Sequence, residues 1–219
     1  MDPAQLANAV TERVTIPVLG GVENWKEQLK FMLQTLSKQP GYLRTRWGPW
    51  TEDQQKLELI TASMTNRSRE IGWISPDACE KWRQSKDFAE AAARVASVLD
   101  GEPVAYLLRF KPYAPHAVIN SPIVETLSFE DCREPENKMR EVVERASRMP
   151  GCNGVASGYS LCPPTSSSGD SIGRTFVAAI GWTGLEASRA ADKSAYTGGM
   201  KTEVHHVDFN FPVKGFGGL

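Results

Sequence analysis

The chain contains 219 residues, of which 41% are hydrophobic and 23% are charged, the proportions of a folded globular protein. With 25 basic and 26 acidic residues its net charge is −1, which disfavours a nucleic-acid-binding protein built on a basic surface. The length predicts two domains of about 110 residues each rather than one small domain.

The first half opens with a strand and a helix. Val14–Leu19 is apolar and β-branched, as in a strand, and apolar side chains then recur at helical spacing over Trp25–Leu36. Pro40–Gly41 ends that helix, and the next strand is expected over Tyr42–Trp50.

A second group of elements completes the first half. Leu57–Met64 and Glu70–Ile74 have the composition of extended segments. Ser75–Asp77 predicts a helix start, because a serine N-cap is followed by proline in the first helical position and an acid in the first turn. We expect this helix to continue to Leu99, with a last strand over Pro103–Phe110.

The second half follows the same plan. Its expected elements are a strand over Ile123–Phe129, a helix over Met139–Met149, strands over Cys152–Leu161 and Arg174–Trp182, a helix opened by a capping box at Thr183–Glu186 and ended at Gly198–Gly199, and a strand over Val204–Phe211. Between the two long strands lies a segment rich in Pro, Ser and Gly, which we interpret as a loop.

Short sequence repeats support two equivalent halves. Pro40–Gly41 recurs about 110 residues later as Pro150–Gly151, and Ile71–Trp73 recurs at a similar offset as Ile180–Trp182. Each half therefore has the β-α-β-β-α-β order of a ferredoxin-like unit. We predict an α+β fold in which the two antiparallel sheets cover each other face to face. The expected domains are residues 1–112 and 113–219, with the proline-containing segment Lys111–Pro122 as the linker.

One motif carries a family resemblance. Residues Trp82–Ala91 have the form W-x-x-S-x-x-F-x-E-A and follow a segment that ends in Gly-Trp. This resembles the antibiotic biosynthesis monooxygenase family, whose fold is the dimeric α+β barrel. The segment Ile180–Ala190 resembles the strand-to-helix junction of fungal members. The resemblance implies two tandem ferredoxin-like repeats that form an intramolecular dimeric α+β barrel, as a monomer with an internal pseudo-dimer or as a homodimer.

The resemblance also implies a function. Several members of this family oxidise anthrones or phenols with O₂ and use no metal or flavin. We therefore expect a cofactor-independent monooxygenase of secondary metabolism acting on a hydrophobic, polyketide-like or aromatic intermediate. The alternatives are a polyketide or pericyclic cyclase or isomerase on the same fold, and a non-catalytic barrel that binds a small molecule. These alternatives stay open, because one fold hosts many activities.

No cofactor, metal, nucleic acid or membrane is expected as a partner. A haem-degrading branch of the family carries a histidine where this chain has Ala92, and the chain has neither a Gly-rich nucleotide motif nor a CxxC pair among its four cysteines. No run of about 18 uncharged apolar residues is present, and the N-terminus lacks the features of a signal peptide. We therefore predict a cytoplasmic protein.

The catalytic candidates lie near the C-terminus. Strand alternation places His205 on the apolar face and places His206 with Asp208 on the other face. A carboxylate beside an imidazole can orient it as an acid or base. The alternative is that one histidine is a surface group and the other a core residue.

Five further residues are candidates for substrate binding. Trp73 and Trp182 end their strands and are expected to offer flat walls to an aromatic ligand. Arg46 and Arg109 are candidates for an acidic group or an oxyanion, and Tyr159 is a candidate phenolic donor. Ordinary core packing for the tryptophans and solvent exposure for the arginines are the competing interpretations.

Overall fold

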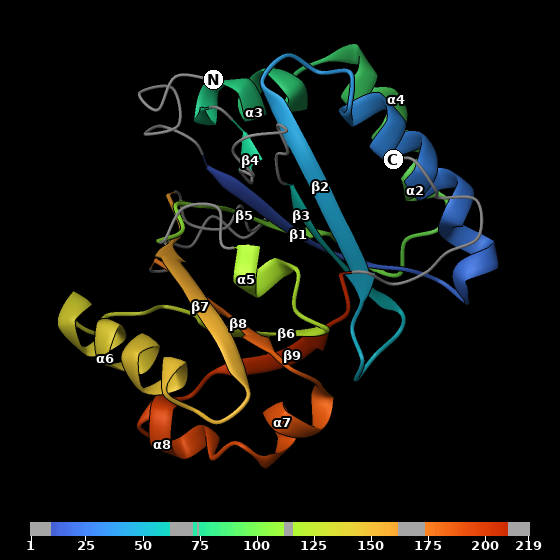
Figure 1. The fold of residues 1–219 in the computed structure, drawn as a ribbon. Coiled ribbons are helices and arrows are strands. Elements are labelled where there is room, and N and C mark those ends of the chain that lie inside the picture. The colour runs from blue at the N-terminus through green and yellow to red at the C-terminus, as the bar shows by residue number, and fades with distance from the viewer. Residues whose placement is uncertain (1–9, 62–71, 74, 112–115, 162–173, 210–219) are drawn as a thin grey trace.

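Two consecutive halves of the chain build the same arrangement of elements. The computed structural model describes residues 10–61, 72–73, 75–111, 116–161 and 174–209 (Figure 1). The first half consists of β1 (Thr11–Pro17), α2 (Val22–Leu36), β2 (Tyr42–Pro49), β3 (Lys56–Thr61), β4 (Gly72–Trp73), α3 (Pro76–Arg83), α4 (Lys86–Ala96) and β5 (Val104–Leu108). After the short helix α5 (His116–Ile119), the second half consists of β6 (Ile123–Phe129), α6 (Glu136–Ser147), β7 (Cys152–Tyr159), β8 (Phe176–Trp182), α7 (Leu185–Ala190), α8 (Lys193–Thr197) and β9 (Glu203–Val207).

Each half is a sheet with helices on one face. The strand order is β4-β2-β3-β1-β5 in the first half and β7-β8-β6-β9 in the second. β3 and β4 both pair with β2, and together they take the place that β8 holds beside β7. Figure 1 shows the helices of each half on the outside and the two sheets facing each other in the middle. The prediction of two tandem ferredoxin-like repeats that form an intramolecular dimeric α+β barrel is confirmed.

Two matched seams close the barrel. Trp50, which follows β2, forms an antiparallel bridge with Val207 of β9, and Ser160, which follows β7, forms one with Leu108 of β5. In both seams the N–H of the next residue donates to a carbonyl oxygen of the facing strand over 2.8 Å. Each sheet thereby covers the edge strand of the other, so these edge strands are paired within the chain.

Glycines allow the strands to approach at both seams. A Cβ atom added at Gly48 would overlap the carbonyl oxygen of Asp208, and one added at Gly158 would overlap that of Arg109. We expect Gly48→Ala and Gly158→Ala each to lower the free energy of unfolding by about 1–3 kcal/mol, because the obstacle is backbone that cannot rotate away. Urea denaturation of the two variants beside the parent measures this.

Gly21→Ala is the matched control for this prediction. Gly21 is the N-cap of α2, its backbone is extended, and nothing lies within 4 Å of an added Cβ. Its replacement is expected to cost less, about 0.5–1 kcal/mol, which is the difference between a glycine and an alanine N-cap. If the Gly48→Ala and Gly158→Ala variants were as stable as this control, the strands at the two seams could move apart without loss of stability, and the prediction would be wrong.

Three hydrophobic layers result from this arrangement. The inner layer fills the barrel between the sheets, and each outer layer lies between one sheet and its helices. The inner layer is composed of Trp50, Ile60, Tyr106, Leu108, Phe110, Val118, Ile119, Val124, Ala156, Val177, Ala179, Val207 and Phe209. None of the helices within the described ranges combines the length and apolar character needed to span a bilayer.

The segment expected to be only a linker contributes to the core. Its residues 112–115 lie outside the described residues, and helix α5 follows them. Val118 and Ile119 of α5 belong to the inner layer, each 2% exposed. In Figure 1 this helix lies between the two sheets. Because α5 packs where β7 begins and β8 ends, it closes that end of the barrel.

The helix predicted from Ser75 to Leu99 is wrong in its continuity. Ser75 is the N-cap of α3 as expected and accepts a hydrogen bond from the Ala78 N–H over 3.2 Å. Ser85 is a second N-cap, which accepts from the Phe88 N–H over 3.0 Å and starts α4. The chain therefore turns between two short helices.

The second half shows the same interruption. Asp192 caps α8 by accepting from the N–H groups of Ser194 and Ala195, so the helix predicted to end at Gly198 is two helices, α7 and α8. The expected capping box at Thr183–Glu186 is also wrong, because the N-cap of α7 is Gly184, which has no side chain to form a cap. Of the last predicted strand, the part from residue 210 onward lies outside the described residues.

Candidate active site

The two adjacent histidines of β9 point to opposite faces of the second sheet. His205 lies on the barrel side and is 1% exposed, and His206 lies on the helix side and is 5% exposed. Each ring contacts a buried glutamate of its own: Glu58 for His205 and Glu125 for His206. The two histidines thus belong to two separate buried polar clusters, one inside the barrel and one outside it.

The barrel cluster joins four strands, two from each half. Arg13 of β1 donates from Nη2 to Glu58 Oε2 of β3 over 3.0 Å, and His205 Nε2 lies 2.6 Å from the same oxygen. Thr126 and Ser128 of β6 complete the cluster, through Glu58 Oε1 at 3.3 Å and Arg13 Nη1 at 3.1 Å. All five side chains are at least 98% buried, so the charges are compensated within the protein.

Charge determines the ionisation state of this cluster. Burial works against ionisation of Glu58, but the positive charge of Arg13 and the contact with His205 outweigh it and lower the pKa of Glu58 to about 2. At neutral pH Glu58 is therefore a carboxylate, which only accepts hydrogen bonds.

The carboxylate in turn assigns the tautomer of His205. At 2.6 Å from an acceptor-only oxygen, Nε2 must carry the hydrogen and donate it to Glu58. A neutral imidazole then has its lone pair on Nδ1. This Nδ1 is buried and has no hydrogen-bond partner among the described residues, and the same is true of Arg13 Nε. An oriented imidazole with a free lone pair is the arrangement of a general base.

Aromatic rings enclose the cluster. The Trp50 ring stacks on His205 with centroids 3.7 Å apart and planes 10° from parallel. Tyr106 of β5 lies beside Arg13, whose Cζ is 5.7 Å from the ring centroid. On the outer side of Trp50, Lys56 Nζ is 4.8 Å from the ring. Flat walls of this kind suit a planar ligand.

A pocket of about 280 Å³ opens over these residues at the barrel end opposite α5. Arg13, Trp50 and Tyr106 form its inner part, and charged side chains surround its mouth. Its lining residues are Arg13, Thr15, Pro17, Trp50, Lys56, Glu102, Val104, Tyr106, Glu130 and Glu203. His205 and Glu58 lie directly behind Arg13 and Trp50, so a ligand in this pocket meets the polar cluster at its inner end.

The second cluster lies between the second sheet and its C-terminal helices. Glu125 of β6, 0% exposed, accepts from Tyr196 Oη over 2.6 Å, from Lys193 Nζ over 2.8 Å and from Ser188 Oγ. Ser188 Oγ also lies 2.7 Å from His206 Nε2. Burial opposes ionisation of Glu125. The neighbouring His206, which has the largest effect, and the donors Lys193, Ser188 and Tyr196 outweigh burial and lower the pKa of Glu125 to about 2.

His206 connects the two halves of the protein. Its Nδ1 contacts Glu52 Oε1, and its backbone N–H donates to Glu52 Oε2 over 2.9 Å, although Glu52 belongs to the first half. The carboxylates in contact with His206 are thus those of Glu52 and Glu125. Asp208 is the carboxylate that the sequence paired with His206, and the structure places its backbone against Gly48. Burial lowers the pKa of His206, but the two carboxylates outweigh it and the pKa is raised.

This raised pKa predicts a pH-dependent stability. The groups that face His206 are Glu52, Glu125 and Ser188, with Lys193 bound to Glu125. A histidine whose pKa is raised on folding contributes stability below its unfolded value of about 6.5 and loses it as pH rises through the folded pKa. We expect the difference in free energy of unfolding between the parent and His206→Gln to shrink as pH rises above about 6.5. Urea denaturation of both proteins from acid to alkaline pH measures it, and a difference independent of pH would contradict it.

A related cluster occupies the equivalent position in the first half. Glu12 of β1, 6% exposed, accepts from Trp73 Nε1 over 3.0 Å and from Arg83 Nη2 over 2.8 Å. Each half thus places a buried glutamate of its first strand opposite a cation of its helices, Arg83 in one and Lys193 in the other. This repetition favours a structural role for both clusters, which tie the helices to the sheets.

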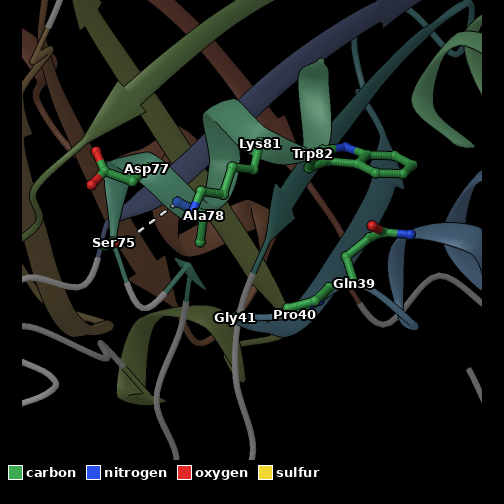
Figure 2. Close-up of a pocket in the computed structure, with 8 residues that line it drawn as sticks. All are labelled: Gln39, Pro40, Gly41, Ser75, Asp77, Ala78, Lys81 and Trp82. Carbon is green, nitrogen blue, oxygen red and sulfur yellow. Dashed lines mark hydrogen bonds between the residues drawn. The ribbon is translucent and has the colours of Figure 1, made fainter. Parts of the chain in front are cut away.

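A further hollow of about 310 Å³ lies between α3 and the turn that follows α2. Figure 2 shows Pro40 and Gly41 on one side of it and Asp77, Lys81 and Trp82 on the other. The dashed line there is the N-cap bond of Ser75. No buried base or unpartnered polar atom lines this hollow among the described residues, so it offers less chemistry than the barrel pocket.

The structure separates the residues proposed for substrate binding. Trp73 and Trp182 are both 0% exposed and lie in the outer layers, where they pack against helices and not against the barrel pocket. Arg46 Nη2 donates to Asn120 over 3.4 Å, beyond helix α5. Arg109 and Tyr159 come together in a different hollow. None of the candidates named from sequence lines the barrel pocket, and His205 comes nearest to it, because its ring stacks on the lining residue Trp50.

Sequence reasoning missed Arg13 and Glu58. Each is a charged residue within a strand that also contains apolar residues. In an isolated sheet the face that carries these charges would be open to solvent, so the charges drew no attention. One signal was available in the sequence. Because the two predicted sheets cover each other face to face, a charged residue on the covered face of a strand needs a partner inside the protein. Among the residues that the structure describes, no three His, Cys, Asp or Glu side chains are grouped so as to hold a metal ion.

Comparison with known proteins supports the fold. The sequence matches no protein-family model. It also matches no curated protein. Among solved structures, an anthrone oxidase-like protein is 10% identical, with a TM-score of 0.62 over 91% of this chain and 90% of that one. A proposed monooxygenase from Fusobacterium nucleatum is 11% identical, with a TM-score of 0.56 over 92% of both chains. A proposed monooxygenase from Lactobacillus acidophilus is 11% identical, with a TM-score of 0.53 over 91% of this chain and 93% of that one. At such identity the likeness establishes a shared fold over about nine tenths of each chain, and function needs its own argument.

Proposed function

We propose that this protein is a cofactor-independent monooxygenase that acts on a hydrophobic, polyketide-like aromatic compound in the barrel pocket. The observation that carries the proposal is the free Nδ1 lone pair of His205, held by Glu58 behind a pocket with aromatic walls. Similarity to an anthrone oxidase-like protein and to proposed monooxygenases supports the reaction type. The small pocket volume, about 280 Å³, favours a compact substrate of few fused rings.

The proposed reaction begins with proton removal. His205 Nδ1 takes a proton from an acidic C–H or O–H of the substrate, and Glu58 stabilises the imidazolium that forms. The Arg13 guanidinium stabilises the resulting enolate or phenolate, because its positive charge faces the developing anion in a site with little water. Trp50 and Tyr106 hold the ring system flat.

The deprotonated substrate then supplies the electrons. For a CH₂ group between two aromatic rings, reaction with O₂ gives a carbonyl group and one molecule of water, so that two hydrogens leave and one oxygen atom enters the product. The carbanion reduces oxygen, and the protein supplies the base, the stabilising charge and the enclosure. The reaction thus balances with no electron donor other than the substrate.

The proposal includes the context of the enzyme. We place it in fungal-type secondary metabolism and in the cytoplasm, as a monomer with an internal pseudo-dimer whose domains are residues 1–112 and 113–219. The intramolecular seams support the monomer, since each sheet already has the other as its partner.

Conversion under controlled gases tests the proposal. Purified protein is incubated with anthrone, and separately with the compound that accumulates in a host lacking the gene, under ¹⁸O₂ and under nitrogen. We expect oxygen-dependent product carrying one ¹⁸O atom, formed faster than in protein-free buffer. Equal conversion under nitrogen would replace the oxygenase with a cyclase or isomerase. Saturable binding without conversion of either compound would make the protein a binding barrel.

A further inference from the structure

A second hollow, of about 590 Å³, lies outside the barrel beside a seam. It is bounded by the residues that follow β5, by α6, by the end of β7 and by the start of β8. Its lining residues are Arg109, Lys111, Glu136, Arg140, Val143, Ser157, Gly158, Tyr159, Leu161, Arg174 and Phe176. None of these lines the barrel pocket, so the two hollows are separate.

This hollow concentrates positive charge. Arg109, Lys111, Arg140 and Arg174 line it against one acid, Glu136, although the whole chain has a net charge of −1. Within the described ranges none of the four cations forms an ion pair, and Arg140 is unpaired even though Glu136 lies one helical turn away on α6. Four cations from three separate parts of the chain are thus gathered around one space, and none of them forms an ion pair with a described residue.

The walls of the hollow are held in place. Lys111 and Ser157 exchange two backbone hydrogen bonds, of 2.7 and 3.0 Å, which fix the start of the lysine side chain. The Tyr159 ring packs edge-on against Phe176 with centroids 5.0 Å apart, and Arg174 Cζ lies 4.5 Å from the Tyr159 centroid. The aromatic wall is thus ordered before a ligand binds, which reduces the entropy lost on binding, and the four cationic residues beside it are exposed.

We propose that this hollow is a binding site for a small molecule that carries a phosphate ester or diphosphate group. Three guanidinium groups and one ammonium group offer more hydrogen-bond donors than one carboxylate can accept from. The paired N–H groups of arginine also match the spacing of phosphate oxygens. The apolar side of the hollow, formed by Val143, Tyr159 and Leu161, receives the organic part of the ligand. The volume lies in the range of about 300–1,000 Å³ that small-molecule sites occupy.

Calorimetric titration with two probes tests this site. Inorganic pyrophosphate presents the charge alone, and a nucleoside diphosphate presents the charge with a planar ring. We expect saturable 1:1 binding of at least the nucleoside diphosphate at low ionic strength, weakened by added salt. Arg140→Gln and Arg174→Gln are each expected to weaken binding roughly tenfold, because each removes a charge-assisted contact.

A control at the C-terminal end of α6 separates this site from general charge attraction. Arg148 follows α6, is exposed and lies outside the hollow, and Arg148→Gln removes the same charge. Binding that is retained in Arg148→Gln and in His205→Gln but weakened in Arg140→Gln supports the site, whatever the outcome for oxygenase activity. No saturable binding of either probe, or equal affinity of the Arg140→Gln variant and the parent, would overturn it.

Discussion

Replacing Arg13 with methionine is expected to lower the free energy of unfolding by about 3–5 kcal/mol. Glu58 is 0% exposed and has its strongest charge partner in Arg13, at 3.0 Å. Without this cation the carboxylate would remain in the barrel with neutral donors only, and burial would then oppose its ionisation. Urea denaturation at neutral pH measures the loss.

The double variant Arg13→Met with Glu58→Met gives the matched comparison. Removal of both charges leaves apolar side chains in an apolar barrel, so the double variant is expected to be more stable than either single variant. His205 loses its hydrogen-bond acceptor in the double variant, so the double variant is expected to remain less stable than the parent. If the loss in free energy of unfolding of the double variant equalled the sum of the losses of the two single variants, the idea that the barrel holds a compensated ion pair would be contradicted.

The local patterns of the sequence predicted most of the fold. Apolar side chains at helical spacing identified α2 and α6, and an apolar, β-branched run identified β1, because these signals depend on neighbours a few residues apart. The repeat of Pro-Gly and Ile-Gly-Trp indicated two equivalent halves. The two interrupted helices were also readable in principle, since Ser85 and Asp192 are good N-cap residues inside each predicted helix.

The site was harder to predict because its contacts join distant parts of the chain. The carboxylate bonded to His205 comes from a residue 147 positions away, and the one on His206 Nδ1 from a residue 154 positions away. Strand alternation correctly separated the two histidines, but it paired His206 with the nearby Asp208. Only closure of the barrel brings β3 of one half against β9 of the other, and no local pattern encodes that meeting.

The role of Trp73 and Trp182 shows the same limit. The sequence placed both at strand ends, where pockets often open, but it did not reveal which face of the sheet they occupy. They lie on the helix side, packed in the outer layers, and Trp73 donates its Nε1–H to the buried Glu12. The aromatic wall of the barrel pocket comes instead from Trp50, at the seam that joins the two halves.

His205→Gln is expected to reduce kcat by about 10²–10⁴-fold, the usual contribution of a general base, with a smaller effect on KM. Glutamine can still donate to Glu58 but has no basic nitrogen at the position of Nδ1. The proton-removal step therefore loses its acceptor, while Arg13, Trp50 and Tyr106 still bind the substrate. Steady-state oxygen consumption with anthrone measures the change, and the thermal unfolding midpoint of the variant shows whether it is folded.

His206→Gln is the matched control, because the same substitution one residue along β9 points to the helix side. It is expected to change stability as described above and to leave kcat within a few-fold of the parent. The pH–rate profile adds a readout that a structural role would not move: the limb due to the base should disappear in His205→Gln and persist in His206→Gln. A folded His205→Gln variant with the kcat and pH profile of the parent would show that the base lies elsewhere. The reverse result, with His206→Gln inactive, would move the chemistry to the Glu125 cluster, where Ser188 and Tyr196 are the groups next to this ring.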